Sequence, residues 1–224
     1  MFNGFSARTI DFLWELRLNN NREWFNEHKE EFKREFQIPM KELGAQVFES
    51  VKNVCGDRGF IHKVSRIYKD ARRIHDGEPY RDHLWFSIEK PSEEWTSTPV
   101  FWFELGPENW SFGLGYYQAR PVTMAKFRAR MDRDPKQFEK LIAPLLKQDK
   151  FVLDGAEYAR KKEAPTLKTA DWYNKKSFSL ICLRQNGAEL FSPEFAQQLI
   201  DGFEFLMPLY DYFVTLDFDP EPKN

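Results

Sequence analysis

The chain has 224 residues, of which 33 are lysine or arginine and 35 are aspartate or glutamate, so its formal net charge is −2. This balance argues against a general affinity for nucleic acid or anionic membranes. Hydrophobic residues make up 42% of the chain, enough for a buried core, and no apolar run approaches the ~18 residues of a membrane span. Aromatic residues reach 17%, which predicts an aromatic core or, for some of them, a ligand groove.

Two features favour the cytoplasm. Cys55 and Cys182 are far apart and belong to no paired-cysteine motif, which is typical of a reducing compartment. Residues 1–6 show no basic segment followed by an apolar one, so we expect no secretory signal. We therefore expect a cytoplasmic protein that neither enters nor crosses a membrane.

Residues 6–54 are predicted to be helical. Ser6 can cap a first helix, which Asn19-Asn20-Asn21 interrupts. A second helix from Arg22 would place three phenylalanines on one face, and Pro39 should end or kink it because proline lacks an amide donor. The apolar residues that form the predicted helix faces are Ile10, Leu13, Leu16, Phe25, Phe32, Phe36, Met40, Leu43, Val47 and Val51.

Residues 60–118 change to a period of two, which predicts strands. The first alternating stretch is Val64–Arg73, and the others are 84–88, 101–105 and 110–116. Short connections between them, such as the turn at 106–109, favour antiparallel pairing.

Residues 123–214 return to a mixture of helix and strand. Thr123 and Pro135 can each begin a helix, and a continuously apolar strand at 177–184 is expected to be buried on both faces. We predict a lysine-rich loop at 154–176, a helix from Ser192-Pro193-Glu194 and a frayed tail at 217–224. The sequence thus predicts an α+β protein, one domain over residues 1–224, with a mainly antiparallel sheet and helices packed on one side.

Several common chemistries are absent from the sequence. There is no phosphate-binding glycine loop, no nucleophile elbow and no zinc or calcium motif, and Gly113-Leu114-Gly115 does not continue as a dinucleotide fingerprint. His75, Asp76, Asp82 and His83 are grouped, but no known ligand spacing fits them. We therefore predict no cofactor and no metal, and leave enzymatic activity open.

Residues 58–81 are the exception to charge neutrality. This segment contains seven cationic and three acidic residues, an excess of four positive charges. In the predicted strand Arg66, Asp70 and Arg72 share one face. These three residues form either an ion-pair network packed on the sheet under a helix or a site for an anion, because arginine presents a planar fork to carboxylate or phosphate. The turn at 76–80 would hold Tyr80 and Arg81 beside them.

The block from Asn20 to Phe25 has two interpretations. Asn21 can cap the second helix, with Trp24 and Phe25 anchoring it to the sheet. Alternatively Asn20, Arg22 and Trp24 form the rim of a pocket whose floor is the arginine-bearing strand.

A set of short motifs carries a resemblance to a known family. The matching stretches are Phe2-x-Gly4-Phe5, Phe12-Leu13-x-x-Leu16, Asn20-Asn21-Arg22-x-Trp24-Phe25, Pro39, Arg66-Ile67-Tyr68-Lys69-Asp70-Ala71-Arg72 and Pro79-Tyr80-Arg81, followed by Gly113, Gly115 and Arg128. With them the sequence resembles the bacterial and fungal family known as domain of unknown function 2461. It departs from that family at Arg73, where phenylalanine is usual, and at Glu78, where lysine is usual. The resemblance implies a shared fold and no particular chemistry.

The preferred functional hypothesis is a binding protein. Its sheet face would hold an anionic small ligand or an acidic segment of a partner through Arg66 and Arg72, with Tyr80 and Arg81 as further candidates. The alternative is an enzyme acting on a phosphate- or carboxylate-bearing substrate, with Asp70 or Glu104 as general base. Nucleic acid is disfavoured by the net acidity.

Overall fold

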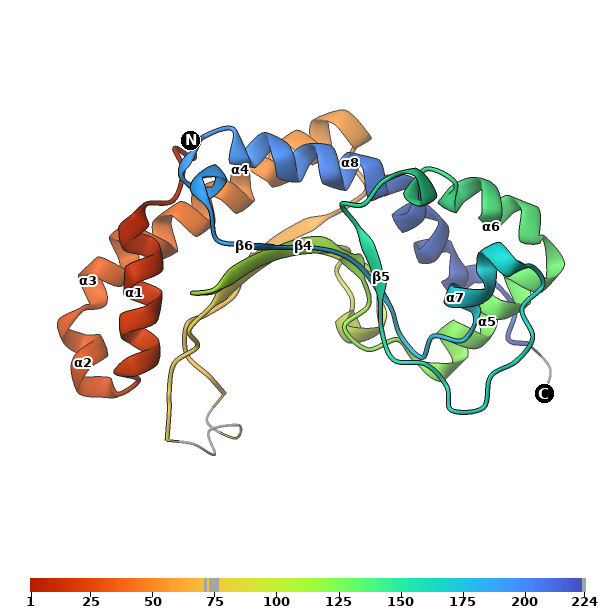
Figure 1. The fold of residues 1–224 in the computed structure, drawn as a ribbon, viewed down its shortest axis with the longest axis horizontal. Coiled ribbons are helices and arrows are strands. Elements are labelled where there is room, and N and C mark those ends of the chain that lie inside the picture. Colours follow the sequence, from red (N-terminus) through yellow and green to blue (C-terminus); the bar gives the residue numbers. More distant parts are fainter. Residues whose placement is uncertain (71, 73–76, 223–224) are drawn as a thin grey trace. The chain divides into compact units, whose positions relative to one another are not determined.

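A computed structural model describes residues 1–70, 72 and 77–222 of the chain. Its strands form one six-stranded antiparallel sheet in the order β1-β2-β3-β4-β6-β5, with helices on one side (Figure 1). The strands are β1 (Ile61–Val64), β2 (Leu84–Glu89), β3 (Val100–Leu105), β4 (Asn109–Gly115), β5 (Val152–Asp154) and β6 (Ser179–Gln185). The predicted α+β class, antiparallel sheet and one-sided helix layer are confirmed.

The helices lie before, between and after these strands in the sequence. They are α1 (Ala7–Leu18), α2 (Arg22–Glu27), α3 (Lys29–Phe32), α4 (Ile38–Cys55), α5 (Pro121–Arg133), α6 (Pro135–Ile142), α7 (Ala170–Tyr173) and α8 (Phe195–Val214). A π-helical segment, Lys33–Gln37, joins α3 to α4.

The chain divides into two compact units. Unit 1 comprises Met1–Ile88, Trp102–Phe112 and Leu183–Gly202, and unit 2 comprises Glu89–Phe101, Gly113–Cys182 and Phe203–Asn224. Each unit has an aromatic core. In unit 1 the ring of Phe103 lies 5.5 Å from Phe86 and 5.6 Å from Phe195, and in unit 2 the ring of Phe213 lies 4.8 Å from Phe178 and 5.6 Å from Phe127.

The helical N-terminal part begins as predicted and then departs from the prediction. Ser6 caps α1 in a reciprocal capping box with Thr9. The single helix predicted from Arg22 is wrong, because the segment is divided into α2, α3, the π-helical turn and α4. Pro39 lies in the first turn of α4 and has no amide to donate to the carbonyl of Glu35, four residues earlier. The buried hydroxyl of Thr9 donates to that carbonyl instead, at 2.6 Å, so α1 satisfies the acceptor that the proline leaves free.

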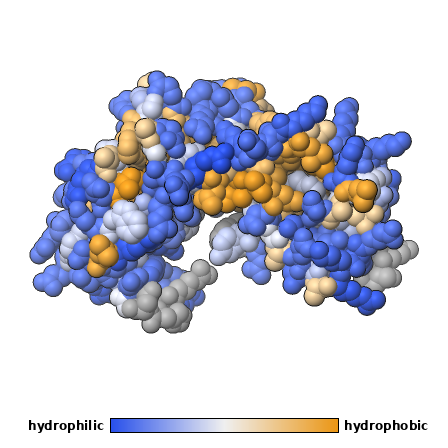
Figure 2. Space-filling view, viewed as in Figure 1, coloured by the Kyte–Doolittle hydropathy of each residue, from blue (hydrophilic) through white to orange (hydrophobic). Residues whose placement is uncertain are grey.

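Two strand predictions need correction. The strand expected over Val64–Arg73 ends at Val64, and beyond it only Tyr68 makes a strand-like bridge, with Tyr80; residues 71 and 73 lie outside the described residues. The strand β6 is not buried on both faces, since Leu183 is 53% exposed. The reason is that helices cover only one side of the sheet, so Leu180 and Cys182 are buried while Leu183, on the alternate face, is exposed. Figure 2 shows hydrophobic residues at the surface where β5 and β6 lie in Figure 1.

The C-terminal third also differs in detail. The helix α5 begins at Pro121 with Arg120 in the cap position, so Thr123 lies within its first turn and is not the cap. The predicted loop at 154–176 contains α7 and a bridge between Glu157 and Lys175. The tail is ordered as far as Asp219, whose carboxylate accepts a hydrogen bond of 2.6 Å from Arg130.

Candidate functional site

The residues singled out by the sequence meet in unit 1, on an extension of the sheet that we call the arm (residues 65–70, 72 and 77–82). Its two sides pair where the amide of Lys69 donates to Pro79 and the amide of Arg81 donates to Ile67, at 2.9 and 2.7 Å. These two bonds flank the bridge between Tyr68 and Tyr80. Neither side of the arm forms a regular strand, because the pairing covers so few residues.

Asn20 fixes the arm to the loop between α1 and α2. Its side-chain amide donates to the carbonyl of Tyr80 at 2.9 Å, and its side-chain oxygen accepts from the amide of Tyr80 at 3.0 Å. A carboxamide that both donates to and accepts from one residue imitates a neighbouring strand. Asn20, predicted as a pocket rim, therefore holds the backbone of the arm.

An aromatic cluster supports the same contact. The ring of Phe25 stacks on that of Tyr80, with centroids 4.0 Å apart, and Tyr68 lies edge-on to Phe25 at 6.0 Å. Trp24 stacks on His28 at 4.1 Å. The anchoring role predicted for Phe25 is thus visible, whereas Trp24 packs within its own helical region.

Three cationic side chains of the arm have partners within the protein. Arg72 forms a bidentate ion pair with Asp70, at 2.7 and 3.1 Å, and its side chain is 88% exposed. Lys69 lies 3.3 Å from the carboxylate of Glu78. The guanidinium of Arg81 donates through Nη1 to the carbonyls of Arg66 and Tyr68, at 2.8 Å for Arg66. Since the Asp70–Arg72 pair is exposed and does not include Arg66, the buried network considered from the sequence is not formed.

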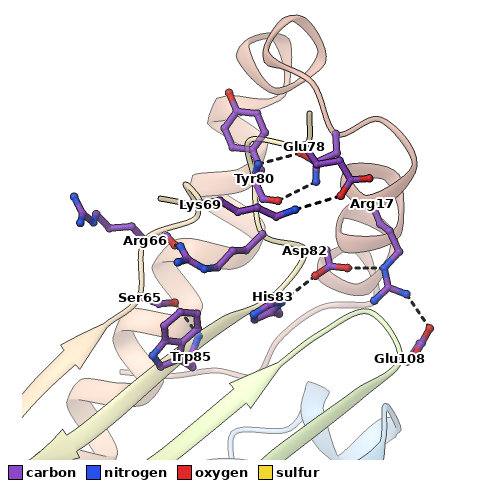
Figure 3. Close-up of polar contacts among 12 residues, drawn as sticks. Arg17, Ser65, Arg66, Lys69, Glu78, Tyr80, Asp82, His83, Trp85 and Glu108 are labelled. Carbon is purple, nitrogen blue, oxygen red and sulfur yellow. Dashed lines mark hydrogen bonds and ion pairs between the residues drawn. The ribbon is translucent and has the colours of Figure 1, made fainter. Parts of the chain in front are cut away.

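Arg66 differs from these side chains. It is exposed, and its guanidinium makes no hydrogen bond or ion pair with any residue that the structure describes. Figure 3 shows it extending away from the group formed by Arg17, Asp82 and His83. Arg22 is likewise exposed and unpaired within the described part of the chain.

A polar group at the root of the arm was not predicted as a site (Figure 3). Arg17 of α1 donates to Asp82 at 2.5 Å and to Glu108 at 2.8 Å, and the other oxygen of Asp82 lies 2.9 Å from Nδ1 of His83. The hydrogen bond from His83, together with Arg17, holds the pKa of the Asp82 carboxyl well below its ordinary value, against the opposing effect of burial. The sequence showed Asp82 and His83 side by side, but nothing in it indicated that Arg17, 65 residues earlier, would join them.

The sheet face away from the helices lies next to this group. A Cβ on Gly106 would be 3.7 Å from that of His83, so these residues face each other across β2 and β3. Antiparallel pairing then places Trp85 opposite Glu104, both partly exposed. Trp85 also lies under the guanidinium of Arg81, 5.0 Å from it. Glu104 has no hydrogen-bond or ion-pair partner in the described ranges.

Neither a metal site nor a membrane span is found in the part of the chain that the structure describes. No three His, Cys, Asp or Glu side chains gather there as ligands for a metal ion, and no helix is both long and apolar enough to cross a bilayer. His75 and Asp76, considered above with Asp82 and His83, lie outside the described residues.

Comparison with known proteins identifies the family. A family model described as a conserved hypothetical protein, DUF2461, matches residues 8–212. The chain belongs to the DUF2461 family. This match confirms the family resemblance, covers its motifs from Phe12 onward and extends it to residue 212, within α8. No curated protein matches the chain. DUF2461 is a family of unknown function, so membership assigns no activity to the arm.

Proposed function

We propose that this DUF2461 protein binds a small molecule bearing a phosphate or a carboxylate on the arm, at the side chain of Arg66. The observation that carries the proposal is Arg66, an exposed guanidinium without an acceptor among the described residues. Arginine stays charged at any physiological pH, and its fork matches both anions. An acidic segment of a partner protein is the second occupant that the same chemistry would accept.

The surroundings of Arg66 support this role. The Arg81 guanidinium is fixed 2.8 Å from the carbonyl of Arg66, so a second positive charge is held beside the same peptide. The acidic groups nearby are engaged elsewhere, since Asp82 binds Arg17 and His83. An anion would therefore meet positive charge here with little competition from carboxylates. Arg72, predicted as an equal partner, contributes less because Asp70 neutralises it.

A second function, catalysis on a ligand of the same class, is favoured by His83. Its Nδ1 is held by Asp82, which Arg17 orients in turn, and this leaves Nε2 without a partner in the described chain. A histidine supported by a carboxylate is a common general base or acid. Glu104, two residues from Gly106 on the facing strand, is the second proton-transfer candidate.

Thermal melts with inorganic phosphate at constant ionic strength test the binding proposal. If Kd is ~1 mM, ~10 mM phosphate adds ~1.4 kcal/mol of stability by mass action. For a chain of this size that is a rise of roughly 3–6 °C in Tm. Arg66→Gln should abolish the rise. Arg34→Gln, which removes an exposed arginine paired with Glu35, should preserve it.

The outcomes separate the two functions. A Tm that does not respond to phosphate, sulfate or a short dicarboxylate, or that responds equally in Arg66→Gln, would refute the binding proposal. Catalysis requires in addition that turnover of phosphate or carboxylate esters is lost in His83→Asn while the phosphate-dependent rise in Tm is kept.

We also propose a cytoplasmic location, supported by the two widely separated cysteines.

A further inference from the structure

A second group of cations lies in unit 2, around the ring of Tyr158. The guanidinium carbon of Arg128, on α5, is 5.2 Å from the ring centroid, and the ammonium nitrogen of Lys176 is 5.9 Å from it. Neither cation forms an ion pair with a described residue. Two like charges beside one aromatic ring repel each other, and the cation–π contacts offset this repulsion only in part.

Arg128 is held with part of its guanidinium already desolvated. Its Nη1 is buried and has no hydrogen-bond partner among the described residues. The same arginine makes no other hydrogen bond to the part of the chain that the structure describes, and its Nε and Nη2 are not among the buried atoms that lack a partner, so both reach solvent. A buried donor without an acceptor destabilises the folded protein. The Arg128 guanidinium therefore lacks an acceptor among the described residues, and a bound anion would supply one.

The nearest carboxylate on the same helix does not neutralise Arg128. Asp132 lies one helical turn further along α5, at the spacing where an ion pair could form. Instead both of its oxygens accept from the hydroxyl of Tyr173 on α7, at 2.9 and 3.0 Å. The pKa of Tyr173 is raised to about 12, first by burial and then by this hydrogen bond, so the hydroxyl remains a donor.

The loop that carries Tyr158 and Lys176 is held in place by its own hydrogen bonds, beside α5 and α7 (Figure 1). The carbonyl of Asn174 accepts from the amide of Tyr158 at 2.9 Å, and its side chain both donates to and accepts from the backbone of Lys162. The amide of Lys176 donates to Ala156 at 2.8 Å. The side chains of Tyr158 and Lys176 therefore project from backbone that these hydrogen bonds hold in place.

We propose that Arg128 and Lys176 form a binding site for a phosphate group. The arginine would give the two accessible nitrogens of its fork to two phosphate oxygens, and the lysine would act as a point charge for a third. Both cations lie against the ring of Tyr158, at 5.2 and 5.9 Å from its centroid. This site lies wholly in unit 2 and does not depend on Arg66, so the two proposals stand or fall separately. Free phosphate and a phosphate monoester share the chemistry it recognises.

The test is an NMR titration of the full chain with inorganic phosphate and, separately, glycerol 3-phosphate, at constant ionic strength. The amide signals of Tyr158 and Lys176 should shift and saturate. Binding should weaken about tenfold or more, a loss of ~1.4 kcal/mol, in Lys176→Gln and in Arg128→Gln. Lys161→Gln is the matched control, because that lysine of the same loop is already paired with Glu157 at 2.6 Å. A preference for the monoester would indicate an organic ligand, and equal binding would indicate phosphate itself.

Three results would overturn the proposal: signals that do not saturate, a response to chloride as large as that to phosphate, or unchanged binding in Lys176→Gln. The last variant is decisive even if Arg128→Gln fails to fold, because Lys176 is exposed. Arg66→Gln must leave the Tyr158 and Lys176 shifts unaltered. If it removes them, the anion binds only at the arm and unit 2 has no site of its own.

Discussion

Replacing Asn20 by alanine should detach the arm from the helical region. The substitution removes both hydrogen bonds that join Asn20 to the backbone of Tyr80, at 2.9 and 3.0 Å. Tyr80 is 3% exposed, so water replaces these bonds poorly. A net contribution of ~0.5–1.5 kcal/mol for each bond gives a loss of roughly 1–3 kcal/mol. Asn20→Asp should lose at least as much, because its carboxylate cannot donate to the Tyr80 carbonyl and would repel it.

Amide hydrogen exchange is the assay suited to this change, because the arm can open without global unfolding. The amides of Lys69 and Arg81, which pair the two sides of the arm, should exchange roughly tenfold faster for each ~1.4 kcal/mol lost. Asn26→Ala is the matched control: this exposed asparagine has no side-chain partner among the described residues, and its removal should change stability by less than ~0.5 kcal/mol. If the amides of Lys69 and Arg81 exchange at unchanged rates in Asn20→Ala, Asn20 does not hold the arm, and its interpretation as a pocket rim residue would be favoured again.

Three further predictions concern charged groups. Asp70→Ala should cost less than ~1 kcal/mol in urea denaturation, because its pair with Arg72 is exposed; a loss of several kcal/mol would mean that the pair is buried. Asp219→Ala should cost about 3 kcal/mol, because it leaves the buried guanidinium of Arg130 without the one carboxylate that pairs with it among the described residues, and a loss below ~1 kcal/mol would contradict this. Burial lowers the pKa of His62, so stability should fall as the pH drops below the unfolded-state value of 6.5. His62→Phe should flatten that pH dependence. If stability falls equally with pH in both proteins, His62 is not the source of the pH dependence.

The sequence predicted elements wherever one local pattern decided the structure. Alternating apolar residues located β2, β3 and β4, because one face of each strand packs on the core and the other does not. The N-cap at Ser6 was likewise a local decision and is confirmed, while α8 begins at Phe195, directly after the predicted start Ser192-Pro193-Glu194. The predictions that failed depended on distant neighbours. The exposure of Leu183, for example, follows from the helices covering only one side of the sheet, and the continuously apolar run at 180–183 could not indicate it.

The candidate site was predicted only as a stretch of sequence. The charge excess of residues 58–81 correctly drew attention to the arm, but a charge count does not reveal partners. Arg17 and Asn20 reach the arm from α1 and from the loop that follows it, over sequence separations of 65 and 60 residues. Such contacts arise from the packing of helices on the sheet, which single-sequence periodicity does not encode. Alternation did place Arg66 and Arg72 together, and it failed because the strand ends at Val64.

An arginine-rich segment does not by itself indicate an anion site, because its side chains can have partners within the protein. Of the arm's cations, Arg72 is matched by an acid two residues away and Arg81 by carbonyls of the facing side, so neither is an open anion site, although both add to the positive field. Arg66 and, in unit 2, Arg128 are different, because the donors that lack acceptors are on their guanidinium groups. If charge excess alone governed binding, Arg72→Gln and Arg66→Gln would weaken phosphate binding equally. Partner geometry instead requires that Arg66→Gln has the larger effect, and measuring the two variants side by side decides between these explanations.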